Sequence, residues 1–563
     1  LHNDHSYLLR AQTMSLPVQV DVIVAGGGPC GLMLANELGR RGVTALVVDD
    51  KPSTAFNPQA NATQARTMEH FRRLGFAYEI RAMGMPGDYP PDIAYFTRYA
   101  GYELARFKLP TAKEASEVVK KLAGSWSAAE LPHRVSQKFV EETLRKHAQK
   151  LPGISVNYGC RLVSFADHGD RVEAEVERIA DGYRHKVRGA YLVGADGPRS
   201  FVRQSLGFAY EGETGIARDF VGGRMAAAYV RAPDFYKAVP HPPAWMYNSF
   251  NRDRRAFCAA VDGKGEFAFH TQLKPGESEH TLTDRDAAAM FLRAVGAEFP
   301  VEVLGRAAWT AGHTLVADQF QRGRVFIGGD AAHLFTPTGG LGYNTAVEDA
   351  VNLGWKLALA VKGTAGPKLL ASYTEERQPL ARRNTGYARG FAISLGEFVP
   401  VAEIEDPTPA GDVARAKAGD YLNAHARSEF NIPGVTFGGR YDGSPIIIAD
   451  GTAPPLDTAN IYVPTGCPGG RAPHLWLGDG ASIYDRFGFD WTLLRLGSNA
   501  PDGDAFIATA RDRGLDLCVV EVPSDEAREL YGADLVLVRP DQIVAWRGAA
   551  AGDARNVLNR VCG

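Results

Sequence analysis

"VDVIVAGGGPCGLMLANELGRRGVTALVVDD", residues 20–50, decides the fold class of this chain. The stretch contains a short apolar run, a glycine-rich turn, a segment with helical spacing and a second apolar run. In that order these elements open a doubly wound α/β sheet, whose parallel strands are buried on both faces. The sequence therefore predicts a Rossmann-like domain that begins here.

The turn between the first apolar run and the helix has the spacing GxGxxG. Gly26 permits a tight turn, Gly28 allows the backbone to approach a pyrophosphate, and Gly31 allows the helix to pack closely on the strand. Pro29 stands at the first helical position, and the helix N-terminus supplies positive potential for an anion. The turn predicts dinucleotide binding, with an ordinary glycine turn as the alternative.

An acidic pair closes the second apolar run. Asp49, about twenty residues after the turn, is placed to accept hydrogen bonds from ribose hydroxyls, and we count the adjacent Asp50 with it. A single GxGxxG is weak evidence. Two strands, a helix and an acid in the expected order make dinucleotide binding the favoured interpretation.

Length and composition exclude several classes of protein. A chain of 563 residues is too long for one core and predicts about two to four domains. Its net charge of −3, with scattered basic residues, does not indicate binding to nucleic acid or to an anionic membrane. Six cysteines without a CxxC indicate reduced thiols, and no apolar run reaches the length of about 18 residues needed for a span. We expect a cytoplasmic protein, with Met14 as a candidate initiator.

The rest of the chain divides by its patterns. Residues 18–209 and 313–397 are predicted to form the nucleotide-binding domain, with an antiparallel substrate-binding sheet from residues 210–312 laid over it. Residues 398–434, rich in proline and acid, are predicted to be a linker or helical segment. Residues 435–563 carry their own strands and are predicted to be a separate α/β domain.

Two further motifs follow predicted strands. "YLVGADGPRSFVRQSLG", residues 191–207, places Asp196 and Gly197 after a strand and Ser200 at the start of a helix. The alternative for this motif is an Asp-Gly turn with a helix cap. "GGDAAHLFTPTGGLGYN", residues 328–344, places Asp330 at the end of a strand and a run of glycines before a helix.

These three motifs, in this order and at these separations, resemble those of the single-component FAD-dependent aromatic hydroxylases, the p-hydroxybenzoate and phenol hydroxylase group. The resemblance covers about residues 20–390. It implies noncovalent FAD, transient NADPH (or NADH), and O2. By resemblance, reduced FAD forms a C4a-hydroperoxide that hydroxylates a phenolic or other electron-rich ring, with water and NADP as the other products.

The resemblance assigns parts of the FAD site to individual residues. Asp330 binds the ribityl chain, and Pro337 lies beside the ring where oxygen reacts. The start of the last helix contacts the isoalloxazine and stabilises the reduced, anionic flavin with its partial positive charge; this contact comprises Gly340, Leu341, Gly342, Tyr343 and Asn344.

Other residues are assigned less directly. Gln137 matches a family position near the flavin, with a polar helix start as the alternative. Arg66 is counted with the cofactor residues, although helix arginines are usually solvated. Asp196 and Arg203 are expected along the NADPH side. His333 is expected to be structural.

The substrate is expected between the isoalloxazine and the antiparallel sheet. Candidates are Met246, Tyr247, Phe257, Phe269 and His270, for which plain sheet packing is the alternative.

A base for the substrate is not evident. In phenol hydroxylases an aspartate precedes the "RT" helix, where this chain has Asn61 in "NPQANATQARTMEHF". Asparagine cannot take up a proton at neutral pH. Either Tyr247 or His270 serves as the base, or the substrate is already acidic or activated. The alternative for Asn61 is that it only caps the following helix.

Residues 435–563 resemble the thioredoxin-like C-terminal domain of phenol-hydroxylase-like and polyketide-hydroxylase enzymes. Thioredoxin chemistry needs paired cysteines, and here Cys467 and Cys518 are far apart in sequence. A structural or subunit-contact role is expected, with a homodimer as the predicted assembly. An aromatic polyketide hydroxylase of the same family is the alternative function, and a flavin reductase without oxygen insertion is a weaker one.

Overall fold

The computed structural model describes residues 16–58, 60–214 and 223–563, so the candidate initiator Met14 lies outside the described residues. The predicted Rossmann-like domain is confirmed. Its six-stranded sheet has the order β17-β18-β9-β1-β2-β5, parallel except for the edge pair β17 and β18. The strands are β1 (Val22–Ala25), β2 (Ala45–Asp49), β5 (Ile154–Tyr158), β9 (Tyr191–Gly194), β17 (Gln321–Arg322) and β18 (Val325–Ile327).

The strand order explains how three distant motifs meet. The glycine turn follows β1, the Asp196 motif follows β9, and the Asp330 motif follows β18. These strands are adjacent and parallel, so their carboxyl ends lie on one edge of the sheet. This edge is where doubly wound sheets bind ligands.

Helices α1 (Pro29–Gly39), α5 (Gln137–Ala148) and α9 (Gly342–Val361) pack around this sheet. A Cβ on Gly354 of α9 would lie 2.5 Å from Cβ of Glu37 on α1, so a side chain there would separate the two helices. Shorter helices of this part are α2 (Ala65–Arg73), α3 (Ala77–Arg81), α4 (Ala112–Val118) and α6 (Phe201–Ser205).

A second sheet has the order β15-β11-β14-β13-β12-β3-β4, antiparallel except for the pair β12 and β3. Its strands are β3 (Ile93–Phe96), β4 (Glu103–Phe107), β11 (Gly223–Arg231), β12 (Met246–Ser249), β13 (Ala256–Ala260), β14 (Glu266–Gln272) and β15 (Glu302–Ala311). Strands β3 and β4 come from the range predicted for the nucleotide-binding domain. The second sheet therefore includes two strands from outside residues 210–312, the range predicted for it.

Two small sheets flank these domains. One contains β6 (Cys160–Asp167), β7 (Val172–Arg178) and β8 (Arg184–Gly189), and the other contains β10 (Tyr210–Glu213), β16 (Thr314–Ala317) and β19 (His333–Leu334). The second small sheet lies where the chain passes between the two larger sheets. Strand β10 leads out of the first domain, and β16 leads back into it.

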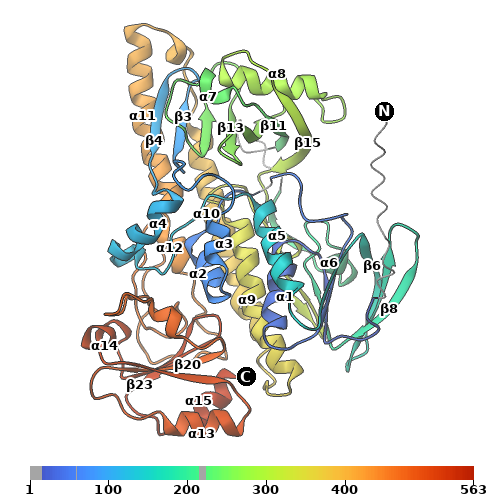
Figure 1. The fold of residues 1–563 in the computed structure, drawn as a ribbon, viewed down its shortest axis with the longest axis vertical. Helices are drawn as coiled ribbons and strands as arrows, with labels where there is room; N and C mark the ends of the chain where they lie inside the picture. The colour runs from blue at the N-terminus through green and yellow to red at the C-terminus, as the bar shows by residue number, and fades with distance from the viewer. Residues whose placement is uncertain (1–15, 59, 215–222) are drawn as a thin grey trace, which may run out of the picture.

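The segment predicted as a linker or helix contains α11 (Pro409–Phe430), which follows α10 (Ser372–Glu397). Thr408 begins α11 by accepting a hydrogen bond from the Gly411 N–H at 3.2 Å, and Pro409 takes the first helical position. A Cβ on Gly419 would lie 2.6 Å from the carbonyl oxygen of Leu104 on β4. The helix thus lies directly against the second sheet, as Figure 1 shows.

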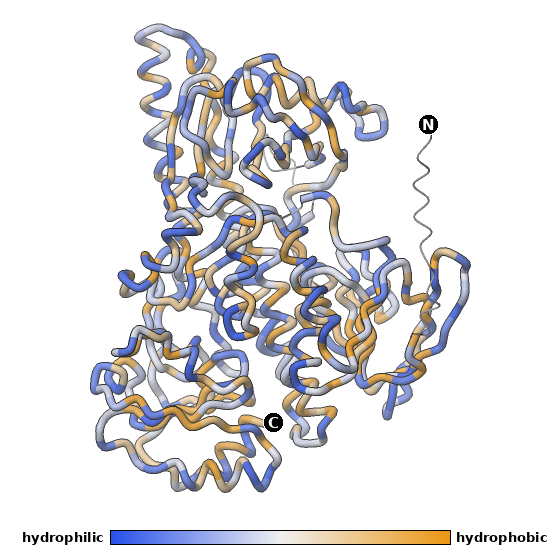
Figure 2. Tube along the Cα trace, viewed as in Figure 1, coloured by the Kyte–Doolittle hydropathy of each residue, from blue (hydrophilic) through white to orange (hydrophobic). Residues whose placement is uncertain are grey.

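The C-terminal domain has the predicted thioredoxin-like fold. Its sheet has the order β21-β20-β22-β23, with β20 and β21 parallel and the other pairs antiparallel. Its elements are β20 (Trp491–Leu496), α13 (Asp504–Asp512), β21 (Leu517–Val522), α14 (Asp525–Tyr531), β22 (Leu535–Val538), β23 (Val544–Gly548) and α15 (Ala554–Val561). All six cysteines are free thiols. In Figure 2 the most apolar residues follow the strands of this domain and of the first sheet.

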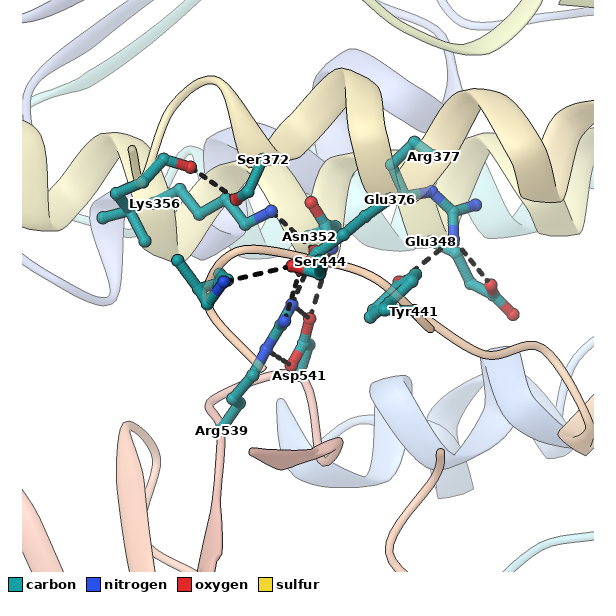
Figure 3. A network of polar contacts seen from close by, with 12 residues as sticks. Glu348, Asn352, Lys356, Ser372, Glu376, Arg377, Tyr441, Ser444, Arg539 and Asp541 are labelled. Atoms are coloured by element: carbon teal, nitrogen blue, oxygen red, sulfur yellow. Dashed lines mark hydrogen bonds and ion pairs between the residues drawn. The ribbon is translucent and has the colours of Figure 1, made fainter. Parts of the chain in front are cut away.

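Buried charges hold this domain against the first (Figure 3). The carboxylate of Glu376 on α10 accepts hydrogen bonds from Arg539 at 2.6 and 2.8 Å and from Lys356 at 2.7 Å. Ser444 donates to the same carboxylate at 2.6 Å. Arg539 also pairs with Asp541, so the network spans α9, α10 and the C-terminal domain. No helix within the described ranges is long and apolar enough to cross a membrane.

Candidate functional site

The glycine turn has the geometry that its spacing predicts. Gly26 has a φ of +112°, and a Cβ there would lie 2.0 Å from the carbonyl oxygen of Ala195. A Cβ on Gly31 would lie 1.9 Å from the carbonyl oxygen of Gly26. Around Gly28 a Cβ would meet no described atom within 4 Å, so the backbone is open there. Two positions therefore require glycine for packing, and one leaves room for a ligand.

The acid at the end of β2 also holds the turn. Asp49 accepts hydrogen bonds from the Gly27 N–H at 2.7 Å and the Lys51 N–H at 2.9 Å. Tyr158 OH donates to the Gly27 carbonyl at 2.8 Å. A carboxylate has about four acceptor positions, so the half-buried Asp49 keeps capacity for ribose. Asp50 is exposed beside it.

Asp330 lies in a short 3₁₀ turn, Gly329–Ala331, with its side chain exposed. Surrounding protein raises its pKa through desolvation, which His333 partly opposes. Tyr210 OH donates to the Asp330 carbonyl, and the Arg203 guanidinium lies 3.9 Å from the Tyr210 ring centroid. The helix that follows the Asp196 motif is thereby linked to the Asp330 turn.

The carboxylate of Asp196 caps α6. It accepts a hydrogen bond from Ser200 Oγ at 2.5 Å and from the Val202 N–H at 3.1 Å, and Gly197 has a φ of +81°. Burial raises the pKa of Asp196, and these hydrogen bonds oppose that effect. The structure thus shows the Asp-Gly turn and helix cap that formed the alternative interpretation, while the role of Asp196 toward NADPH stays a prediction.

A buried carboxylate that sequence reasoning missed supports the Asp330 turn. Asp349 on α9 accepts hydrogen bonds from the Gly329 N–H at 3.0 Å and from Arg377 Nε at 2.7 Å. His333 Nε2 lies 2.6 Å from the same carboxylate. Burial would raise the pKa of Asp349, but His333 and Arg377 hold it below its ordinary value. His333 is fully buried, in agreement with the structural role expected for it.

The glycine loop, residues 337–344, is shaped by contacts with residues 60–64. Gly339 and Gly340 have φ values of +64° and +63°. Asn344 Oδ1 accepts from the Gln64 N–H at 2.8 Å, and its Nδ2 donates to the Ala62 carbonyl at 2.9 Å. Gln64 Nε2 donates to the Gly339 carbonyl at 2.7 Å. The Asn344 side chain is therefore occupied, and only its backbone is left for a ligand.

The other residues of this loop differ in exposure. Pro337 is exposed and Leu341 is buried, while Gly342 begins α9. Tyr343 OH lies 3.4 Å from Thr63 Oγ1. Leu341 is the N-cap residue, and its side chain caps none of the first backbone N–H groups of α9.

Two other predicted cofactor residues, Gln137 and Arg66, make different kinds of contact. Gln137 begins α5, is half-buried, and donates through Nε2 to Glu141 at 2.7 Å. Arg66 donates to Gln542 and to the carbonyl of Asp541, both at 2.6 Å, and pairs with Glu69. The guanidinium of Arg66 is therefore committed to the C-terminal domain and to Glu69, and its contact with the cofactor stays a prediction.

These residues fit FAD. The N-termini of α1 and α9 both lack a side-chain cap, so their first N–H groups are available to a pyrophosphate and to the electron-rich edge of a flavin. Asp330 presents an exposed carboxylate on the same edge of the sheet. The residues that would hold FAD are Gly28, Asp49, Asp330, Gly342 and Tyr343.

Strand alternation divides the predicted substrate residues. Met246, Phe257 and His270 share the inner face of the second sheet with Tyr229. This inner face meets the FAD-binding domain, because the Tyr229 ring lies 5.7 Å from Phe56. Lys138 Nζ also donates to Tyr229 OH at 2.7 Å.

Tyr247 and Phe269 lie on the opposite face. The Tyr247 ring packs 5.1 Å from Phe235 of α7 (Phe235–Ala238), and Phe269 packs 5.5 Å from Phe291 of α8 (Asp284–Val295). Burial raises the pKa of Tyr247 to about 12. Both residues thus show the sheet packing that was the alternative, and their contact with a substrate stays a prediction. Adjacent residues of a strand point to opposite faces, which for Phe269 and His270 was already evident in the sequence.

His270 accepts a hydrogen bond and does not have the surroundings of a base. Its Nδ1 accepts from Trp309 Nε1 at 3.2 Å, and its ring stacks on Phe257 at 4.6 Å. Burial lowers the pKa of His270 to about 4, so the ring is neutral and carries its proton on Nε2. Asn61 lies in the segment beside the glycine loop. Its buried Oδ1 has no hydrogen-bond partner among the described residues.

Comparisons with known proteins agree with this geometry. A family model described as an FAD binding domain matches residues 19–388, and one described as aromatic-ring hydroxylase, C-terminal, matches residues 465–563. The chain is similar to 2,4-dichlorophenol 6-monooxygenase of Delftia acidovorans, at 28% identity over 97% of this chain and 98% of that protein. It is also similar to aklavinone 12-hydroxylase of Streptomyces purpurascens, at 32% identity over 96% of this chain and 98% of that protein.

A solved ternary complex of aklavinone-11 hydroxylase with FAD and aklavinone has a TM-score of 0.81 with this chain. The two are 28% identical, and the match covers 97% of this chain and 100% of that one.

Proposed function

The chain belongs to the family of FAD-dependent aromatic-ring hydroxylases, and from this premise we propose that its substrate is an aromatic compound that already carries an acidic or activating substituent. The enzyme is a flavin-dependent aromatic monooxygenase that uses FAD, NADPH or NADH, and O2. When bound, FAD accepts hydride from the nicotinamide and activates oxygen for transfer to the ring.

The chain's own residues bind and orient the reactants. The uncapped N-terminus of α1 would receive the pyrophosphate, and Asp330 would accept hydrogen bonds from the ribityl hydroxyls. The N-terminus of α9 places positive potential beside the electron-rich edge of the reduced flavin. Asn344 and Gln64 hold the glycine loop in the shape that this contact needs.

The observation that carries the substrate proposal is that none of the three candidate bases offers a free proton acceptor on the inner face. Asn61 replaces the acid of phenol hydroxylases, Tyr247 lies on the opposite face, and His270 presents an N–H. Without a base among these candidates, a ring that is already ionised or activated by a second substituent reacts more readily than phenol. An aromatic polyketide is a second candidate, favoured by the 32% identity to aklavinone 12-hydroxylase.

NADPH and oxygen consumption against a panel of aromatic compounds tests this proposal. We expect dihydroxy, amino or carboxy-substituted rings to give coupled hydroxylation, with product identified by mass spectrometry. Coupled hydroxylation of unsubstituted phenol faster than that of every substituted ring would contradict the proposal. NADPH oxidation independent of any aromatic would indicate a reductase instead.

Three expectations stay proposals: preference for NADPH over NADH, a homodimer, and a cytoplasmic location. The first is tested in the same assay by comparing the two nucleotides. A native mass measurement tests the second, and cell fractionation tests the third.

A further inference from the structure

Arg134 is a buried arginine, only 5% exposed, and it makes no ion pair with any residue that the structure describes. Its buried Nε likewise has no hydrogen-bond partner there. The guanidinium lies 4.6 Å from the Trp245 ring centroid and 5.9 Å from that of Phe430. Cation–π contacts stabilise a buried ion by less than its desolvation costs, so the aromatic rings leave this charge undercompensated.

The acid that acts on Arg134 electrostatically is already committed elsewhere. Glu429 Oε1 accepts a hydrogen bond from the Gly339 N–H at 2.9 Å, and its Oε2 lies 2.8 Å from His425 Nε2. Burial lowers the pKa of Arg134 to about 10, and the charge of Glu429 opposes that effect. Arg134 is therefore charged at neutral pH and lacks a partner in contact with it.

The surroundings of Arg134 connect the glycine loop with the second sheet. Its neighbour His133 exchanges backbone hydrogen bonds with Thr63 at 2.8 and 2.9 Å, and Thr63 lies beside Tyr343 of the loop. Trp245, under the guanidinium, stands just before the start of β12, directly before Met246. The arginine thus lies at the junction where the substrate ring is expected.

We propose that Arg134 binds an anionic oxygen of the substrate, either a carboxylate or an ionised phenol, and so determines specificity for acidic aromatic compounds. Arginine suits this task because its planar guanidinium offers several donors to one anionic group. The proposal rests on the proposed function and explains how a site without a base selects an activated ring. A bound anion would also supply the counter-charge that the folded protein does not.

Ligand titrations of the FAD-loaded enzyme, followed by flavin absorbance, test the proposal. The carboxylate arm compares 2,4-dihydroxybenzoate with its neutral amide, and the phenolate arm compares 4-nitrophenol with 4-nitroanisole in buffer alkaline enough to ionise the phenol. We expect the wild type to prefer the anionic member of at least one pair by about tenfold to 100-fold. Arg134→Met should abolish that preference, and Arg134→Lys should keep part of it.

Arg415→Met is the matched control. Arg415 also lies over an aromatic ring, that of Tyr102 at 3.8 Å, but it donates to the carbonyls of Ile404 and Asp406. This variant should keep the wild-type preference. An unchanged preference in a folded, FAD-loaded Arg134→Met enzyme would overturn the proposal. So would a wild type that favours neither anion, including one that binds no probe.

The assignment of Arg134 and the proposed function can be contradicted separately. If the wild type holds FAD and couples NADPH oxidation to aromatic hydroxylation but shows no anion preference, only the assignment of Arg134 is wrong. If it holds no flavin, the proposed function is wrong as well. Should Arg134→Met not fold, the ratio of the affinities of Arg134→Lys for the anionic and the neutral probe decides. A ratio equal to that of the wild type would also contradict a bidentate contact.

Discussion

The carboxylate of Asp349 accepts a hydrogen bond from the backbone N–H of Gly329 at 3.0 Å, which ties helix α9 to the turn that carries Asp330. The same carboxylate pairs with Arg377 and His333, all of them fully buried. One helix therefore supplies both the N-terminus that we propose faces the flavin and the acid that holds the turn of Asp330.

Replacing this acid tests that connection. Asp349→Asn leaves Arg377 buried without its full counter-charge, so we expect a loss of about 3–5 kcal/mol in the free energy of unfolding, together with weaker FAD retention. Thermal melting and the flavin-to-protein absorbance ratio measure the two effects. Asp170→Asn on an exposed turn is the control and should change stability by less than about 0.5 kcal/mol. Equal melting and flavin content in both variants would refute the connection.

The cofactor role of Asp330 predicts a specific loss. Its exposed carboxylate is expected to accept hydrogen bonds from the ribityl chain, and such charged hydrogen bonds contribute about 1.5–3 kcal/mol. Asp330→Ala should therefore weaken FAD binding by about tenfold or more, measured by flavin fluorescence on reconstitution of the apoprotein. The melting temperature of the apoprotein should be unchanged. A colourless wild type that takes up no flavin would contradict the entire FAD assignment.

Asp196 is expected to matter for reduction of the flavin. Removing its carboxylate frees the start of α6, which positions Arg203 over Tyr210 next to the Asp330 turn. Asp196→Ala should slow flavin reduction by NADPH, with a smaller effect on oxygen consumption after chemical reduction by dithionite. Ser200→Ala, which removes the contacts of Ser200 Oγ with Asp196 and the Arg203 N–H but keeps the Asp196 carboxylate, should have a milder effect. NADPH reduction at the wild-type rate in Asp196→Ala would rule out this role.

The buried network of Figure 3 predicts how the C-terminal domain is attached. Glu376→Gln leaves Lys356 without its ion-pair partner and Arg539 with Asp541 alone, and we expect destabilisation by about 3–5 kcal/mol and faster proteolytic release of residues 435–563. The double change Glu376→Leu with Arg539→Leu should recover part of that loss. The exposed pair Arg231 and Glu302 serves as the control, and breaking it should lower the free energy of unfolding by about 0–1 kcal/mol. If both pairs cost the same, the network does not hold the domain.

Buried histidines predict loss of stability in mild acid. Burial, assisted by neighbouring arginines, lowers the pKa values of His133 and His474 to about 3, against about 6.5 in the unfolded chain. Between these values the unfolded state binds more protons, so the free energy of unfolding falls as pH decreases, by up to about 1.4 kcal/mol per pH unit for each histidine.

Melting temperatures measured between about pH 7 and 4.5 should show this fall. His133→Gln should make the dependence shallower, whereas the same change at the exposed His280 should not. Identical slopes in all three proteins would exclude His133 as a source of acid lability.

Much of the fold was predictable because its signals are local. The GxGxxG turn, Asp196 and Asp330 each follow an apolar run, and parallel strands end on one edge of a sheet whenever they are neighbours. The thioredoxin-like domain was likewise predicted from its run of strands and its resemblance, and the missing CxxC was visible in the sequence. The partners of Arg66 were not, since a helix arginine gives no local sign of a distant acceptor.

The sequence by itself determined the class of cofactor, the order of the two family segments and the glycine turn whose backbone is open at Gly28. These depend on short-range spacing and on glycine's lack of a Cβ, which operate within a few residues. Only the tertiary structure decided that Tyr247 packs on Phe235, that β3 and β4 complete the second sheet, and that Arg134 is buried over Trp245 without a carboxylate in contact. Those outcomes depend on strand register and on packing between segments far apart in the chain, and a shift of one residue in a strand exchanges its two faces.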